Sequence, residues 1–248
     1  MKRYALIKPA VLAGSALFAG FAFAGDPAPK ATIAPPSDIE ASFGVGYTNE
    51  YVFRGDNRGD DLFEASIGVS GSGSLLGLGD LDLSAGLWLG TYTAPGQSRT
   101  SSLNLNEMRI NMEASRSLGC FDLAVGVTNY SYYGQASRAD NLEPYVALST
   151  DLAGLAVGIG LYDTEDADDP YWEITVGRSV DLGGLALSVD GVVGTLNEFD
   201  DTFYGVSVSL PISASDRITV TPHVSAIFGD TTSDDDEFTA GVKLDFGF

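Results

Sequence analysis

Charged side chains in this 248-residue chain recur at every second position within otherwise apolar segments. In NEMRINMEA, residues 106–114, Glu107, Arg109 and Glu113 share one parity, whereas methionine and isoleucine occupy the other. Successive residues of a β-strand point to opposite faces, so the charges would lie on one face. Such a face does not break bonds in a substrate, but it generates an electric field across a polar or aqueous space.

The same parity rule, applied along the whole chain, yields a set of charged residues that would line one shared interior. The candidate pore-lining residues are Glu50, Glu64, Asp82, Glu107, Arg109, Glu113, Asp122, Glu143, Glu173, Asp190, Lys243 and Asp245. Ten of them are acids and two are bases. A water-filled lumen lined by carboxylates favours cations, and we expect Glu64, Glu107, Arg109, Glu113 and Glu173 to set a transverse field at a constriction.

A second interpretation uses the same residues as a satisfied polar network that fills a narrow interior. Arg109 would then bridge Glu107 and Glu113. Inward glycines such as Gly126 and Gly160 are compatible with both interpretations, because glycine leaves open space or lets a tyrosine lie over the neighbouring backbone. The sequence leaves an open lumen and a filled one as alternatives.

Patterns for catalysis and metal binding are weak. His223 is the only histidine, and its parity, shared with Ser225, directs it to the interior rather than toward a lipid substrate. The acidic stretch DTEDADD at 163–169 lacks the glycine and glutamate positions of an EF-hand. The Arg-Gly-Asp tripeptide occurs twice within 54–60, in a predicted loop. We therefore predict no enzyme, no metal site and no cofactor.

The charged face must be positioned by strands, and from residue 39 onward the chain alternates with period two in about twelve segments. The predicted strands are 39–53, 61–70, 80–92, 103–115, 119–133, 142–150, 154–163, 171–180, 184–196, 203–213, 216–228 and 237–248. Most are near the roughly 9 to 11 residues that a tilted strand needs to cross a bilayer.

The connections between these segments alternate in length. Short turns such as DLAG and DLGG alternate with longer charged loops such as RGDNRGDD, APGQSRTSS and GQASRADN. Short periplasmic turns and longer extracellular loops are typical of transmembrane barrels. With an even number of strands, both ends of the barrel chain fall on the short-turn, periplasmic side.

The positions of the aromatic residues favour a transmembrane barrel over a soluble β-sandwich, which also has short alternating strands. Those with outward parity at the predicted long-loop ends are Tyr51, Phe53, Phe63, Trp172, Tyr204, Phe228 and Phe238, and those at the short-turn ends are Phe121, Phe246 and Phe248. Two aromatic girdles flanking an aliphatic band suit a bilayer. We predict an all-β, antiparallel, up-and-down transmembrane barrel of about twelve strands over residues 39–248.

The N-terminal region predicts export. Residues 1–24 combine a basic start, a short apolar run and a small-residue cleavage pattern, as in a signal peptide, and residues 25–38 form a Pro-rich periplasmic tail. Removal of residues 1–24 leaves 10 of the 13 basic residues and all 34 acids. This charge argues against nucleic acid as a partner. Cys120 is the single cysteine, so no intramolecular disulfide forms.

Two stretches resemble known proteins. FTAGVKLDFGF at the C-terminus looks like the assembly signal of bacterial outer-membrane barrels, which here comprises Val242, Leu244, Phe246 and Phe248. GVGYTNEYVFRG is similar to the first strand of the TorF-type porin family, with the motif at 51–55 (Tyr51, Val52, Phe53, Arg54 and Gly55). The resemblance implies a porin-like barrel that the barrel-assembly machinery inserts.

These observations together predict a porin-like channel in the bacterial cell outer membrane, reached after export to the periplasm. It would allow passive diffusion of small hydrophilic solutes, preferably cations, in contact with outer-membrane lipid and lipopolysaccharide. The alternative is a non-conducting surface protein whose acidic extracellular loops bind a partner or divalent cations. The oligomeric state and the solute are not predicted.

Overall fold

The computed structural model describes residues 39–74, 80–94, 104–133, 139–163, 170–196, 200–230 and 236–248. The predicted signal peptide, the Pro-rich tail and the acidic stretches 164–169 and 231–235 lie outside the described residues. Within the described ranges, no helix is long and apolar enough to cross a membrane.

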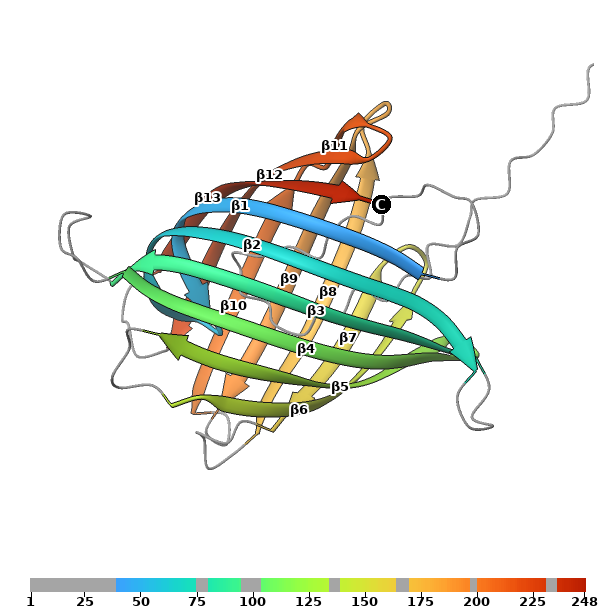
Figure 1. Ribbon diagram of the computed structural model, residues 1–248, viewed down its shortest axis with the longest axis horizontal. Helices are drawn as coiled ribbons and strands as arrows, with labels where there is room; N and C mark the ends of the chain where they lie inside the picture. The colour runs from blue at the N-terminus through green and yellow to red at the C-terminus, as the bar shows by residue number, and fades with distance from the viewer. Residues whose placement is uncertain are drawn as a thin grey trace, which may run out of the picture.

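One antiparallel sheet closes on itself to form a barrel (Figure 1). Its strands are β1 (Ile39–Phe53), β2 (Asp56–Ser74), β3 (Asp80–Thr93), β4 (Asn104–Leu118), β5 (Phe121–Tyr133), β6 (Asn141–Asp151), β7 (Ala156–Tyr162), β8 (Tyr171–Asp181), β9 (Ala186–Leu196), β10 (Asp201–Ser209), β11 (Ile212–Ser215), β12 (Ile218–Asp230) and β13 (Glu237–Gly247). Strands β1 to β10 pair in chain order, β1 also pairs with β13, and β10 pairs with β12 to close the ring.

The barrel wall has twelve strand positions around its circumference, as predicted, although the sheet has thirteen strands. Strands β10 and β11 together occupy one of these positions. Both pair with β12, β10 along one part of it and β11 along another. The predicted strand 203–213 is interrupted at Leu210 and Pro211, where proline has no N–H for the ladder. Leu210 N still donates to Pro222 O at 3.0 Å, so the wall continues across the break.

The side chains alternate between an exposed apolar face and a polar interior face. In β6, Asn141, Glu143 and Tyr145 are buried, whereas Leu142 and Val146 are exposed. This is the reverse of a soluble domain, which buries its apolar residues and rarely exposes large contiguous apolar patches. The barrel therefore has the surface of a transmembrane protein, and the soluble sandwich is excluded.

The two ends of the barrel differ. At the short-turn end, described turns at 119–120, 152–155, 182–185 and 216–217 join the strands, and the C-terminus lies there as well. At the opposite end, which we call the long-loop end, β3 and β4 are separated by residues 94–103 and β7 and β8 by residues 163–170. The alternation of connection lengths follows the prediction except at two places. Only two residues join β1 and β2, and residues 197–200 between β9 and β10 are no more numerous than those of the turns at 152–155 and 182–185.

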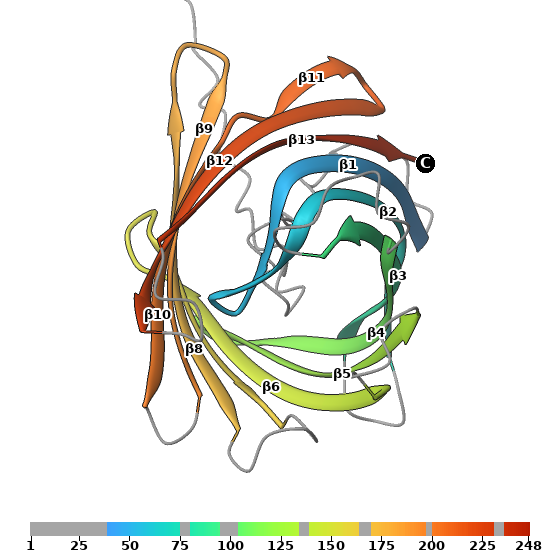
Figure 2. The same ribbon diagram turned by 90° about the vertical axis from the view of Figure 1, so that its left-hand side faces the viewer.

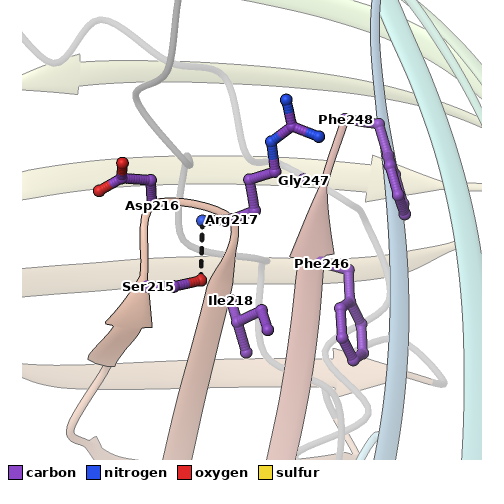
Figure 3. A pocket seen from close by; sticks show the side chains of 7 residues that line it. All are labelled: Ser215, Asp216, Arg217, Ile218, Phe246, Gly247 and Phe248. Carbon is purple, nitrogen blue, oxygen red and sulfur yellow. Dashed lines mark hydrogen bonds between the residues drawn. The ribbon is translucent and has the colours of Figure 1, made fainter.

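The C-terminal strand closes the barrel against the first strand. Phe43 pairs with Phe246 in register, and their ring centroids lie 5.9 Å apart. Phe248 N donates to Ala41 O at 2.9 Å, and Gly247 N donates to Arg217 O at 2.9 Å. Figure 3 shows Phe246 and Phe248 beside β1 at a groove that the turn around Arg217 also lines.

Deleting Phe248 should reduce the amount of assembled barrel several-fold. Phe248 is 73% exposed at the short-turn end, so it contributes little to packing, while the resemblance of the C-terminal segment to an assembly signal predicts that the insertion machinery reads this residue. Heat-dependent gel mobility of outer-membrane fractions measures the assembled form. Phe248→Tyr, which keeps an aromatic ring, is the control. Equal assembly of the deletion and of wild type would contradict the assembly signal.

Candidate functional site in the barrel interior

The turn between β1 and β2 folds into the barrel instead of extending beyond it. Tyr51, Val52 and Phe53 are consecutive, yet their exposed fractions are 0, 0 and 6%. A wall strand buries only every second side chain, so both faces of this hairpin lie inside. Figure 2 shows the β1–β2 turn within the ring of strands, viewed from the long-loop end. We call residues 51–59 the inner hairpin.

A two-residue turn forms the tip of the inner hairpin. Arg54 and Gly55 have φ angles of 53° and 79°, and they connect the paired residues Phe53 and Asp56. Positive φ at both central residues is the requirement of a type I′ turn. Gly55 adopts this conformation readily, whereas it costs an arginine about 1 kcal/mol or more. The contacts of Arg54 must therefore stabilise the tip.

Two irregularities in strand pairing bend the hairpin out of the wall. The register shifts between Tyr51 and Val52 on the side facing β2, and between Asp60 and Phe63 on the side facing β3. Asp61 adopts a positive φ of 55° in the second of these. Bulges of this kind bend a strand and increase its twist, which directs the end of the hairpin toward the barrel axis.

Two predictions from the sequence are wrong in this region. The loop predicted at 54–60 is a two-residue turn followed by strand β2, and the arginine of the first Arg-Gly-Asp tripeptide, Arg54, is buried. Tyr51 and Phe53 were predicted to face lipid but lie inside. The parity rule assumes a strand that stays in the wall, so it fails where the hairpin leaves the wall.

Arg54 at the tip reaches the opposite wall and binds Glu143 on β6. Its two terminal nitrogens donate to Glu143 Oε2 at 2.7 Å and Oε1 at 2.8 Å. Tyr130 on β5 donates to the same carboxylate at 3.1 Å. The guanidinium carbon lies 4.1 Å from the ring centroid of Tyr171 and 5.2 Å from that of Tyr162. A bidentate pair between aromatic faces is a strong, orientation-specific contact.

A row of aromatic rings crosses the interior wall beside this pair. Tyr145, Tyr162, Tyr171 and Phe203 come from β6, β7, β8 and β10, with successive centroids 5.5, 5.4 and 6.4 Å apart. Tyr162 and Tyr171 both donate their hydroxyls to Glu173, at 2.7 and 3.0 Å. Glu173 is thus a buried carboxylate whose hydrogen bonds fix the orientation of two rings.

Glycine makes room for these rings. A Cβ atom on Gly126 would lie 2.3 Å from the Tyr145 ring, and one on Gly194 would lie 2.3 Å from the Phe203 ring. The sequence left open whether inward glycines create empty space or allow a tyrosine to lie over the backbone. At these positions an aromatic side chain lies over the glycine backbone.

The other face of the inner hairpin packs against a second ionic cluster on β4. Arg109 Nε donates to Glu107 Oε1 at 2.6 Å, and a terminal nitrogen of Arg109 donates to the hydroxyl of Tyr51. Tyr51 in turn donates to Glu107 at 3.2 Å. The Arg109 guanidinium also lies 4.5 Å from the Phe53 ring and 4.6 Å from the Trp88 ring. Each hairpin face therefore contacts one buried ion pair.

The predicted bridge from Arg109 to both Glu107 and Glu113 is only half right. Glu113 accepts a hydrogen bond from Tyr145 at 2.8 Å instead, because the guanidinium is turned toward the hairpin. Glu64 accepts a hydrogen bond from the Trp88 indole N–H at 2.6 Å.

The remaining candidates have the lumen-facing parity, most of them toward the short-turn end. Lys243 Nζ lies 3.4 Å from Asp245 Oδ1. Asp82 and Asp122 each accept a hydrogen bond from a cross-strand serine at 2.5 Å, and the Asp190 carboxylate lies over Gly177. Glu50 is half-buried on the first strand. The structure thus brings Glu107, Arg109, Glu143 and Glu173 together around the hairpin. Glu64 and Glu113 lie next to it through Trp88 and Tyr145, and Glu50 directly precedes it.

At the level of the inner hairpin the interior is filled. The exposed fractions of Tyr51, Val52, Tyr162, Tyr171 and Phe203 are all 0 or 1%, although these residues come from opposite sides of the ring. Such packing resembles a protein core.

His223 is on the lumen face, as predicted. Its Nε2 lies 3.4 Å from Thr48 Oγ1, and Ser225 is instead within 3.0 Å of Thr239 Oγ1. The described residues therefore place no serine hydroxyl on this histidine in the geometry of a catalytic pair. The absence of an enzyme activity stays a prediction.

Arg54 and the tyrosines of the aromatic row are functional candidates that are not among the twelve pore-lining residues predicted from the sequence. A usable signal was present, because Tyr51, Val52 and Phe53 are three large apolar residues in succession. Such a run is uncommon in a strand with one polar face, although Leu87, Trp88 and Leu89 form one in the wall strand β3. The Arg-Gly pair that follows Phe53 is the more specific signal, because it marks a turn rather than the start of a long loop.

Comparison with known proteins agrees with the architecture. No family model matches the chain, and no curated protein matches it, so the TorF-type resemblance stays a prediction. Among solved structures, an outer membrane channel from Pseudomonas putida F1 matches 87% of this chain and 97% of its own, at 10% identity and a TM-score of 0.53. Outer membrane phospholipase A from Escherichia coli matches 85% and 90%, at 14% identity and a TM-score of 0.52. The chain has the fold of outer-membrane β-barrels.

Proposed function

We propose that this protein is an outer-membrane channel for the passive diffusion of small hydrophilic solutes, preferably cations, and that the inner hairpin closes it. The supporting observation is a twelve-position barrel with a charged interior face, into which a single hairpin folds and packs against strands on both sides. Barrels of about eight strands are filled by their own wall side chains, and those of sixteen or more leave a channel. Here the blocking element is a separate hairpin, which can be displaced without opening the wall.

Cation preference follows from the charges that remain after pairing. Arg54 is neutralised by Glu143 and Arg109 by Glu107. Lumen-facing carboxylates such as Glu64, Glu113 and Asp190 outnumber the remaining interior bases, Arg58 and Lys243, each of which lies beside an aspartate. A net negative lining attracts cations and repels anions.

Replacing Glu113 by glutamine should lower the cation preference, because it removes a lumen charge while the amide still accepts the hydrogen bond from Tyr145. Replacing Glu107 by glutamine should lower it further, because Arg109 would then carry an unpaired positive charge. Reversal potentials of refolded protein in planar bilayers under a salt gradient measure both changes.

Asp181→Asn is the matched control, since this exposed carboxylate only accepts hydrogen bonds from Gly183 and Gly184 in a turn at the short-turn end. It should leave the reversal potential nearly unchanged. Anion preference of the wild-type channel, or identical reversal potentials for all variants, would contradict a lining that selects cations. Absence of channels from every variant would identify a non-conducting barrel.

A further inference from the structure

The guanidinium of Arg54 occupies a binding site that belongs to the barrel wall and not to the hairpin. Glu143 on β6 binds both terminal nitrogens, and Tyr162 on β7 and Tyr171 on β8 present their ring faces. The arginine comes from a different element, the tip of the β1–β2 hairpin. The bound group, Arg54, and the site that binds it are thus parts of one chain. The arginine can leave the site without any loss of pairing between wall strands.

The wall residues are held in place independently of Arg54. Tyr130 donates a hydrogen bond to Glu143 at 3.1 Å and fixes the carboxylate. Tyr162 and Tyr171 are oriented by their hydroxyl bonds to Glu173, which leaves their faces turned toward the guanidinium. Glu143 and Glu173 are 1 and 3% exposed. The wall therefore presents a carboxylate and two aromatic faces whether or not the hairpin is docked.

The shape of the site is specific for a planar cation. A carboxylate that accepts two parallel N–H bonds matches the fork of a guanidinium or amidinium group, and aromatic faces stack on such planar groups. An ammonium ion has no such fork and is more strongly hydrated, so it fits this site less well.

We propose that the wall site formed by Glu143, Tyr162 and Tyr171 binds the guanidinium or amidinium group of an external solute, in competition with Arg54. The inference builds on the proposed channel, since a solute entering the lumen would replace the docked tip and release the hairpin. The solute class is defined by the chemistry of the site: small, hydrophilic molecules that carry a planar cation.

The test measures binding of ethylguanidinium to purified protein in detergent, with ethylammonium at the same concentrations as the comparison. In Arg54→Ala the wall site is vacated, so we expect saturable binding of ethylguanidinium, read by calorimetry and by a rise in the unfolding temperature. The apparent affinity should exceed that of wild type by about tenfold or more, because in wild type the tethered guanidinium competes for the site.

Two further variants complete the design. Arg58→Ala is the matched control, because Arg58 pairs with Asp56 at 3.0 Å and does not contact the wall site, so it should bind like wild type. Arg54→Ala combined with Glu143→Gln should lose the binding. If Arg54→Ala does not fold, Arg54→Lys keeps the charge without the fork, and ethylguanidinium should bind it more tightly than wild type.

Equal binding of ethylguanidinium and ethylammonium, or binding that survives Glu143→Gln, would overturn the proposal. None of these measurements depends on conductance. Binding without channel activity would support the site and refute the channel, whereas channel activity without binding would do the reverse.

Discussion

Shortening the inner hairpin should convert the barrel into a steadily open channel. The change replaces Tyr51–Gly59 by Asn-Gly, so that a two-residue turn joins Glu50 and Asp60, which are paired in the wall. Asn-Gly suits the type I′ turn that such a connection needs. The variant removes Tyr51, Val52, Phe53 and Arg54 from the interior and keeps the strand register.

The expected size of the effect follows from the contacts that hold the hairpin. If they favour the closed state by about 3 kcal/mol, which corresponds to about two factors of ten in population, the open fraction of wild type is about one in a hundred. Mean conductance in planar bilayers should then rise about 100-fold in the variant. Replacing the Asp216–Arg217 turn by Asn-Gly alters a turn far from the hairpin and should leave conductance unchanged. A folded, shortened variant that conducts like wild type would contradict closure by the hairpin.

Replacing Glu143 by alanine should destabilise the barrel by about 3 to 5 kcal/mol, because it leaves the charge of Arg54 buried without a partner. Arg54 exposes only 9% of its surface, so water cannot replace the lost carboxylate unless the hairpin undocks. Adding Arg54→Ala removes the unpaired charge and should recover a large part of the loss. Urea unfolding in detergent, followed by tryptophan fluorescence, measures both free energies.

The ion pair between Arg58 and Asp56 is the internal control for this comparison. Its side chains are 22 and 35% exposed, and partly exposed pairs contribute only about 0 to 1 kcal/mol. Asp56→Ala should therefore have a small effect. Equal losses for Glu143→Ala and Asp56→Ala would show that the tip of the hairpin does not depend on its contact with the wall.

The wall strands could be predicted from the sequence because the alternation of their side chains depends only on residues that are neighbours in the chain. Alternation of side chains with period two is set by strand geometry, and in a barrel each strand has the same inner and outer environment. The boundaries of β1 and β8 therefore follow closely from where the alternation begins and ends, and Glu143 and Glu173 lie on the predicted face.

The site could not be predicted to the same extent because it depends on contacts between residues far apart in sequence. Arg54 and Glu143 are separated by 89 positions, and nothing in either strand alone indicates that a guanidinium crosses the interior. The parity rule also contains no information on whether a hairpin stays in the wall. The inward direction of the hairpin results from the two bulges and from the packing of Val52 against the aromatic row.

The accessibility of Val52 tests most directly whether the inner hairpin occupies the interior. In a Cys120→Ser background, which removes the exposed native thiol, Val52→Cys and Asp56→Cys would each be treated with a membrane-impermeant maleimide in proteoliposomes. The side chain of Val52 is 0% exposed and that of Asp56 is 35% exposed. A docked hairpin predicts much slower labelling of Val52→Cys than of Asp56→Cys. Equally rapid labelling of both would contradict it.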